Sequence, residues 1–461
     1  MSINRRQFLK IASSGMAAVA VGSAGGYGLF WRAGEAMAAT PILRLSMVAA
    51  MMEMNDQIQV PVWAFQKQDD PLPRVPGIAI FSVEGDEIQI SITNTLTVRH
   101  AFFIPNVVNS GDIMPGQTVT VTFTAPAAGT YMYYDNTNAP MNRVMGLHGP
   151  LVVLPRIPFT PYTNPPSNML RLFNDLGTSD HFPGSPWDPD RNWFWFLNSF
   201  DPGKNLAAAA SPGMSSSNFT NGYLAQYFTI SGKSGFFASH DPKIRLEGYV
   251  GQPGLVRCLN AGLITHSYHL HGNHAYLLAN NDFDRGDTSI SNNIRMLDTW
   301  PLAPLQGKDI LVPFIKPPDI PPSVWPPTQE NFPLDYPMHC HTEPSQTAAG
   351  GNYPGGLLTH FIIKGPLLTQ SNAVVQVTKA ELRLRFGKVS ISGISSQPAG
   401  TILQIRTGAS DNGTIIGTTT VKSGGRWSFS GRALKALISR SFSITTQGGG
   451  PRRLDIRPVI R

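Results

Sequence analysis

Histidines are concentrated in one short segment of this sequence. Four of its eleven histidines form the motif His266-x-x-His269-x-His271-x-x-His274. Side chains alternate between the two faces of a β-strand, so the sequence predicts that His269 and His271 point to the same face of a strand. Two imidazoles on one face can hold one metal ion or two adjacent ions. His266 lies far enough along the strand to serve a different site.

A second motif adds a thiol to this set of imidazoles. In the segment Tyr336–His341, His339 and His341 share one predicted strand face, while Cys340 points to the other. A thiolate together with imidazoles is the ligand set of blue copper sites. The sequence therefore predicts a copper site, with the following metal ligands: His266, His269, His271, His339, Cys340 and His341.

Two alternative interpretations compete with a metal site. The histidines can be exposed or satisfied by hydrogen bonds inside a core, and Cys340 can pair with Cys258, the only other cysteine. Cys258 lies in the apolar segment Leu255–Gly262, which favours a buried free thiol. With only two cysteines, the chain cannot contain a disulfide framework.

The elements that must position these residues are short strands. Alternating Ile88, Ile90 and Ile92 indicate a half-buried strand, and similar segments separated by turns recur along the chain. We predict an all-β fold of two Greek-key β-sandwiches, followed by a small immunoglobulin-like β-sandwich. The predicted sandwiches span residues 39–155, 222–367 and 376–461. An irregular connector rich in proline and aromatic residues is predicted over residues 156–221, with Trp193–Phe196 packing on the sandwiches.

The two motifs resemble those of the multicopper oxidases, specifically the type built from two cupredoxin domains and related to small laccases and copper nitrite reductases. This resemblance covers roughly residues 45–365. It implies that His266 and Cys340 hold the type 1 copper, where catalysis begins, and that His269 holds the type 2 copper. His271, His339 and His341 would hold the type 3 pair. It further implies oxygen as electron acceptor, a small molecule or a metal ion as reductant, and a trimeric assembly.

The sequence departs from the family pattern at several ligand positions. Two H-x-H pairs expected in the first domain are replaced by His100-Ala101-Phe102 and Tyr134-Asp135-Asn136. Ser345 stands where a second type 1 histidine is expected, and the axial methionine is replaced near Leu357. Substitute ligands can be sought at His274, Glu343 and His360, or at a methionine elsewhere in the chain. A complete set of eight imidazoles is unavailable even from a homo-oligomer, because the chain has only two H-x-H pairs.

Three functions follow from this pattern. The first is a copper-dependent oxidoreductase whose copper site has fewer ions than usual. The second is a copper-binding or copper-tolerance protein without turnover. The third is a cell-envelope scaffold that reuses the oxidase fold. The intact histidine and cysteine motifs argue against a pure scaffold, and the altered first domain argues against a standard laccase.

The N-terminal segment indicates export. Arg5-Arg6 followed by Phe8-Leu9-Lys10 matches the twin-arginine pattern. An apolar stretch follows, and Ala36-Met37-Ala38 offers a cleavage site. We therefore expect a signal peptide over residues 1–38 and a periplasmic or secreted protein. The alternative is a membrane anchor, which the many Gly and Ser residues disfavour.

The C-terminal segment carries most of the positive charge. Residues 376–461 contain fourteen Lys or Arg and three Asp or Glu, a net charge of +11, against +7 for the whole chain. Such a module can bind anionic polymers of the cell envelope. An ordinary solvated basic surface is the alternative, and no nucleic-acid partner is predicted.

Overall fold

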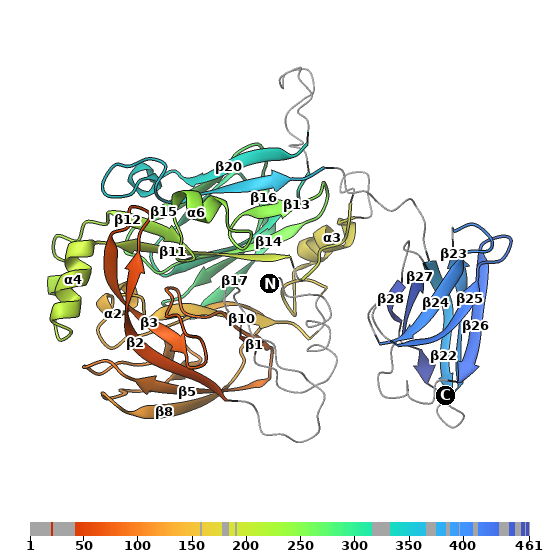
Figure 1. The fold of residues 1–461 in the computed structure, drawn as a ribbon, viewed down its shortest axis with the longest axis horizontal. Helices are drawn as coiled ribbons and strands as arrows, with labels where there is room; N and C mark the ends of the chain where they lie inside the picture. The colour runs from red at the N-terminus through yellow and green to blue at the C-terminus, as the bar shows by residue number, and fades with distance from the viewer. Residues whose placement is uncertain are drawn as a thin grey trace, which may run out of the picture. The chain divides into compact units, whose positions relative to one another are not determined.

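A computed structural model describes residues 20–21, 42–156, 159–177, 184–189, 191–315, 332–365, 375–383, 388–395, 397–408, 414–432, 442–447, 453–456 and 458–460. The chain divides into two compact units, residues 1–367 and 368–461 (Figure 1). Both units consist mainly of β-sheet, so the all-β prediction is confirmed. The predicted signal peptide lies outside the described residues except for Ala20–Val21, which pair antiparallel with Ile80 and Phe81.

The first sandwich consists of two sheets. One has the strand order β1-β4-β10-β9-β6-β7 and the other β3-β2-β5-β8. The strands of the first sheet are β1 (Ala20–Val21), β4 (Ile80–Val83), β10 (His148–Leu154), β9 (Gly129–Tyr134), β6 (Phe103–Ile104) and β7 (Val108–Asn109). Those of the second are β3 (Gln59–Lys67), β2 (Leu43–Glu53), β5 (Glu87–Asn94) and β8 (Thr118–Thr124). A one-turn helix, α2 (Met141–Val144), precedes β10.

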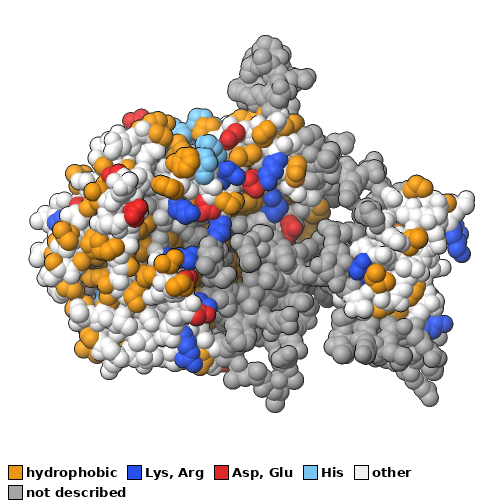
Figure 2. Space-filling view, viewed as in Figure 1, with side chains coloured by type: hydrophobic (Ala, Val, Ile, Leu, Met, Phe, Trp, Pro, Cys, Tyr) orange, Lys and Arg blue, Asp and Glu red, His pale blue; other side chains and the backbone are white. Residues whose placement is uncertain are grey.

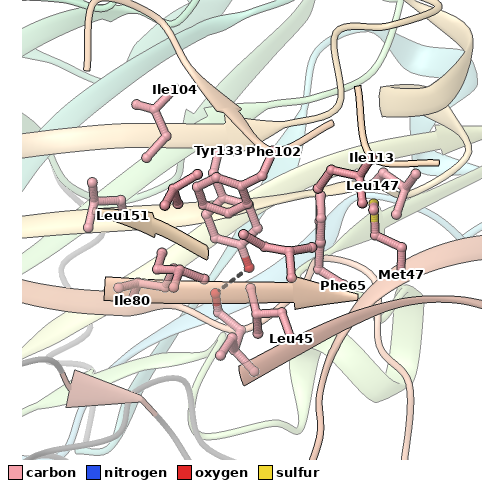
Figure 3. Packing of buried hydrophobic residues seen from close by; sticks show 14 of the residues in the cluster. Leu45, Met47, Phe65, Ile80, Phe102, Ile104, Ile113, Tyr133, Leu147 and Leu151 are labelled. Atoms are coloured by element: carbon pink, nitrogen blue, oxygen red, sulfur yellow. Dashed lines mark hydrogen bonds between the residues drawn. The ribbon is translucent and has the colours of Figure 1, made fainter. Parts of the chain in front are cut away.

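The core of this sandwich follows the predicted alternation. Ile88, Ile90 and Ile92 of β5 are fully buried. Between the sheets, the rings of Phe102 and Tyr133 stack with centroids 5.2 Å apart (Figure 3). The Tyr133 hydroxyl donates a hydrogen bond of 2.6 Å to the carbonyl of Ile78, which satisfies the one polar atom that this ring brings into the core.

The second sandwich also consists of two sheets, with strand orders β12-β11-β14-β19-β16-β17 and β13-β21-β20-β15-β18. The first of these sheets contains β12 (Tyr227–Ile230), β11 (Asn192–Phe200), β14 (Gly254–Asn260), β19 (Gln306–Val312), β16 (Ala275–Asp282) and β17 (Asp287–Leu297). The second contains β13 (Leu246–Gly248), β21 (Leu358–Ile363), β20 (Leu334–Cys340), β15 (His266–Leu270) and β18 (Thr299–Leu302). Short helices join the strands: α3 (Ser167–Asp175), α4 (Pro202–Ala210), α5 (Ser216–Thr220), α6 (Gly235–Ser239) and the 3₁₀-helix η1 (Glu343–Gln346).

The aromatic segment around Trp195 corrects one prediction. We predicted an irregular connector over residues 156–221, but β11 within it is a strand that pairs in parallel with β14. Trp193 and Trp195 face the core of the second sandwich. Phe194 and Phe196 point to the opposite face and pack against the first sandwich. Because both faces of β11 are buried, its sequence lacks the apolar–polar alternation that identifies a half-buried strand.

Polar contacts also join the two sandwiches. Arg257 of β14 and Asp309 of β19 form a fully buried ion pair of 3.2 Å. Thr130, from β9 of the first sandwich, donates to the other oxygen of Asp309 at 2.8 Å. The hydroxyl of Tyr162, from the segment between the sandwiches, donates to Asp309 at 2.7 Å. Asp309 therefore connects both sandwiches and the segment between them.

The C-terminal unit is a separate β-sandwich, as predicted. Its sheets have the orders β26-β23-β22-β29 and β25-β24-β27-β28. The first contains β26 (Arg426–Arg432), β23 (Lys388–Ser395), β22 (Val375–Arg383) and β29 (Val459–Ile460). The second contains β25 (Ile415–Thr420), β24 (Ile402–Thr407), β27 (Phe442–Thr446) and β28 (Arg453–Ile456). Trp427 is buried at the centre of its core. Among the described residues of the whole chain, no helix is long and apolar enough to cross a membrane.

Candidate metal centre

Two adjacent strands bring the two histidine motifs together. β15 and β20 are antiparallel, and their register places Tyr268 opposite Cys340 and His269 opposite His339. His271 and His341 follow directly after the ends of these strands. The imidazoles of His269, His271, His339 and His341 therefore gather on one face of the sheet, which we call the histidine cluster.

The rings of the histidine cluster lie close enough to share metal ions. Ring centroids are 4.6 Å apart for His269 and His271, 4.8 Å for His269 and His341, and 5.0 Å for His339 and both His271 and His341. The Nε2 atoms of His271 and His339 are 2.9 Å apart. Figure 2 shows histidine side chains at the surface of the larger unit, in the region where β20 runs.

Burial favours the neutral, metal-binding form of two of these imidazoles, His271 and His339. Burial, followed by the nearby imidazoles, lowers the pKa of His271 below its usual value. Burial is also the main cause that lowers the pKa of His339. The Nδ1 atom of His269 hydrogen-bonds the Thr299 hydroxyl at 3.0 Å and the Asp298 carbonyl at 3.2 Å, which leaves its Nε2 available. Such outer partners fix the orientation of metal-ligating histidines.

Cys340 lies on the opposite, inward face of the same sheet. Its Sγ is 3.5 Å from Nδ1 of His266, and both side chains are fully buried. The backbone N–H groups of Ser267 and Thr342 donate to this sulfur at 3.3 and 3.4 Å. Burial lowers the pKa of His266 to about 4, so its imidazole is neutral and able to act as a ligand.

The pair of Cys340 and His266 is one ligand short of a blue copper site. Such sites need two imidazoles and a thiolate in a trigonal arrangement. Ser345 is buried in the loop after Cys340, where its hydroxyl donates to the Thr342 carbonyl at 2.6 Å. The Leu357 carbonyl accepts from the Cys340 N–H at 3.2 Å, and its side chain is apolar. The residues around Cys340 therefore do not complete a type 1 site.

His360, one of the substitute ligands considered, faces away from Cys340. In β21, Thr359 and Phe361 are buried toward the core, and His360 points outward between them. The second cysteine, Cys258, is a buried free thiol in the core, so neither cysteine is in a disulfide. Among the described residues, no three His, Cys, Asp or Glu side chains already converge on one point as a finished metal site does.

In the first sandwich, the two segments compared with the H-x-H pairs of the family contain one histidine, His100, and its side chain is buried. Nδ1 of His100 is 2.5 Å from Oδ2 of Asp135, and the Asn142 amide donates to the same carboxylate at 2.9 Å. His100, Asp135 and Asn142 are all buried. The two sequence positions compared with copper-ligating pairs are therefore adjacent in space, and Asp135 holds the Nδ1 atom of a completely buried His100 ring.

His148 is a structural histidine, and it predicts acid sensitivity. Its ring stacks on Phe196 with centroids 5.0 Å apart, and burial lowers its pKa to about 3. In the unfolded chain this imidazole gains a proton below about pH 6.5. The neutral form of His148 therefore contributes its whole stabilisation above pH 6.5. This contribution decreases as the pH falls below 6.5, and it is gone once the pH is below about 3, where the folded protein also takes up the proton.

We expect the free energy of unfolding to fall steadily between pH 6.5 and 4, measured by urea unfolding at each pH. His148→Gln should show a weaker dependence over this interval, because glutamine takes up no proton. An identical pH dependence in both proteins would contradict the assignment.

Sequence reasoning named six candidate ligands, and it did not name the groups that orient their side chains. Thr299 and Asp298, beside His269, and Gln346, whose amide donates to the Cys340 carbonyl at 2.8 Å, belong to other segments. No local pattern marks these residues, because their role depends on strand pairing.

Comparisons with known proteins agree with this fold. Residues 52–157 match a family model described as multicopper oxidase. Among solved structures, the blue copper oxidase from Nitrosomonas europaea is 19% identical, with a TM-score of 0.52, covering 70% of this chain and 85% of that one. The multicopper oxidase mgLAC is also 19% identical, with a TM-score of 0.50, covering 70% of this chain and 86% of that one. The search of curated proteins found no significant match.

Proposed function

We propose that this chain, whose residues 52–157 match the multicopper oxidase family model, is a divergent relative of that family and an exported copper-dependent oxidoreductase with a reduced number of coppers. One observation carries the proposal: the histidine cluster and the buried Cys340–His266 pair occupy opposite faces of the same two strands. Imidazole nitrogens suit copper, and copper bound to the histidine cluster would supply one-electron redox chemistry.

Two features of the chain itself support metal binding and electron transfer in this proposal. His271 and His339 are kept neutral by burial, so they are ready to bind metal near neutral pH. Cys340 is the covalent neighbour of both His339 and His341, so the peptide backbone joins the inward thiol to the outward cluster. We propose oxygen as the electron acceptor and a small molecule or a metal ion as the reductant.

Export and assembly are further parts of the proposal. The Arg5-Arg6 motif supports export through the twin-arginine route to the periplasm or beyond. The exposed position of the histidine cluster is compatible with a homotrimer in which a neighbouring subunit covers it. The basic composition of residues 376–461 supports binding to an anionic envelope polymer.

The test is the number of coppers bound per chain after reconstitution, measured by elemental analysis together with the visible spectrum. We expect one or two coppers and oxidase activity with phenols, amines or metal ions. Cys340→Ser should remove any thiolate-to-copper absorption while the histidine cluster retains copper. A protein that binds no copper would overturn the proposal.

A second function is favoured by the incomplete surroundings of Cys340. Because Ser345 and Leu357 provide no ligand, the protein can be a copper-binding protein without turnover. This alternative predicts the same copper content but no oxygen consumption with any reductant. Oxygen-electrode measurements on the copper-loaded protein distinguish the two functions.

A further inference from the structure

A second pair of histidines lies on the same outward sheet face, separate from the histidine cluster. His360 of β21 and His240, which follows α6, have ring centroids 6.5 Å apart and lie at an angle of 48°. The register of β20 and β21 pairs His339 with Leu358 and Pro337 with His360. His360 is thus a diagonal neighbour of His339, one strand away from the cluster.

Each imidazole of this pair is held by its Nδ1 atom. Nδ1 of His240 hydrogen-bonds the Phe236 carbonyl at 2.8 Å, which requires the proton to be on Nδ1. Nδ1 of His360 is 3.2 Å from a carboxylate oxygen of Asp335. In the neutral form of each ring, Nε2 is then the nitrogen with the free lone pair. This arrangement, with a carbonyl or carboxylate behind each ring, is the one that metal-ligating histidines have.

The spacing and surroundings of the pair also suit a metal ion. Two imidazoles bound to one tetrahedral ion through bonds of about 2.0–2.1 Å have ring centres roughly 5 Å apart, so the two rings, now 6.5 Å apart, must move closer by about 1 Å to share an ion. The ring of Phe236 stacks on His240 at 4.0 Å and restricts its orientation. The Asp335 side chain is 48% exposed, so its negative charge is close to the site and the approach from solvent is open.

We propose that His240 and His360, supported by Asp335, form a second metal site that binds a divalent cation of the Cu²⁺ or Zn²⁺ class. The two imidazoles are the ligands, and water completes the coordination. Asp335 is a positioning residue that acts through the His360 ring. The site is independent of the histidine cluster and of the copper-dependent activity proposed above.

Equilibrium dialysis with Zn²⁺ tests this site without redox chemistry. We expect the double variant His240→Ala/His360→Ala to bind one Zn²⁺ fewer than the wild-type protein. The variant His271→Ala/His339→Ala should retain that ion, which separates this site from the cluster. Asp335→Asn should weaken binding about 10–100-fold, as expected when an outer partner of a ligating histidine is lost.

Phe237→Ala, an exposed neighbour on α6, is the matched control and should leave Zn²⁺ binding unchanged. His240 and His360 are at the surface, so their replacement should not affect folding, which circular dichroism checks. An unchanged number of Zn²⁺ ions in His240→Ala/His360→Ala would overturn the proposal, whatever the copper content of the protein.

Discussion

Replacing Asp309 with alanine is expected to lower the free energy of unfolding of the first unit by about 3–5 kcal/mol, because it leaves a buried charge without its partner. Arg257 and Asp309 are both completely buried, and their atoms lie 3.2 Å apart. The substitution also removes the acceptor for Thr130 and for the Tyr162 hydroxyl. Urea unfolding, followed by tryptophan fluorescence, measures the loss.

Two further variants separate the buried pair from charge effects in general. Asp112→Ala breaks the ion pair with Arg99, whose side chains are 59% and 47% exposed, and should cost about 1 kcal/mol or less. The double variant Arg257→Met/Asp309→Leu removes both buried charges and should recover most of the loss. If Asp309→Ala is no more destabilising than Asp112→Ala, the buried ion pair does not hold the sandwiches together.

Replacing His271 and His339 together by alanine is expected to weaken copper binding by at least about 100-fold. This is more than the loss of affinity expected when a group that hydrogen-bonds a ligating histidine is removed. Their Nε2 atoms are 2.9 Å apart. Both side chains are partly exposed, so the variant should fold normally. Competition with a copper chelator of known affinity measures the change.

The matched control is Phe237→Ala, an exposed side chain on α6 that belongs to neither proposed metal site. Its tightest copper binding should equal that of the wild-type protein. Copper affinity that survives the loss of His271 and His339 would show that the metal is held elsewhere, for example by Cys340 and His266.

Local sequence patterns were sufficient to predict the fold class and which histidines share a strand face. A spacing of two residues on a strand places His269 with His271 and His339 with His341, and the short alternating strands indicated β-sandwiches. The same period-two rule placed Cys340 on the inward face, where it is fully buried. Each of these inferences depends on residues close together in the chain.

Strand β11 shows where local patterns were insufficient. Its aromatic side chains are buried on both faces, by its own sandwich on one side and by the first sandwich on the other. A strand covered on both faces has no polar positions, so its sequence has no alternation to detect. The connector prediction over residues 156–221 was therefore wrong for this strand.

What the sequence determined by itself is the set of donors: four imidazoles in two same-face pairs, and a thiol beside one pair. What only the tertiary structure decided is which donors meet. The register of β15 and β20 joins the two pairs into one cluster. The fold of the first sandwich buries His100 against Asp135, and the packing of α6 beside β21 places the ring centroids of His240 and His360 6.5 Å apart. These contacts join residues far apart in the chain, and strand register is set by the packing of the whole sandwich rather than by any local pattern.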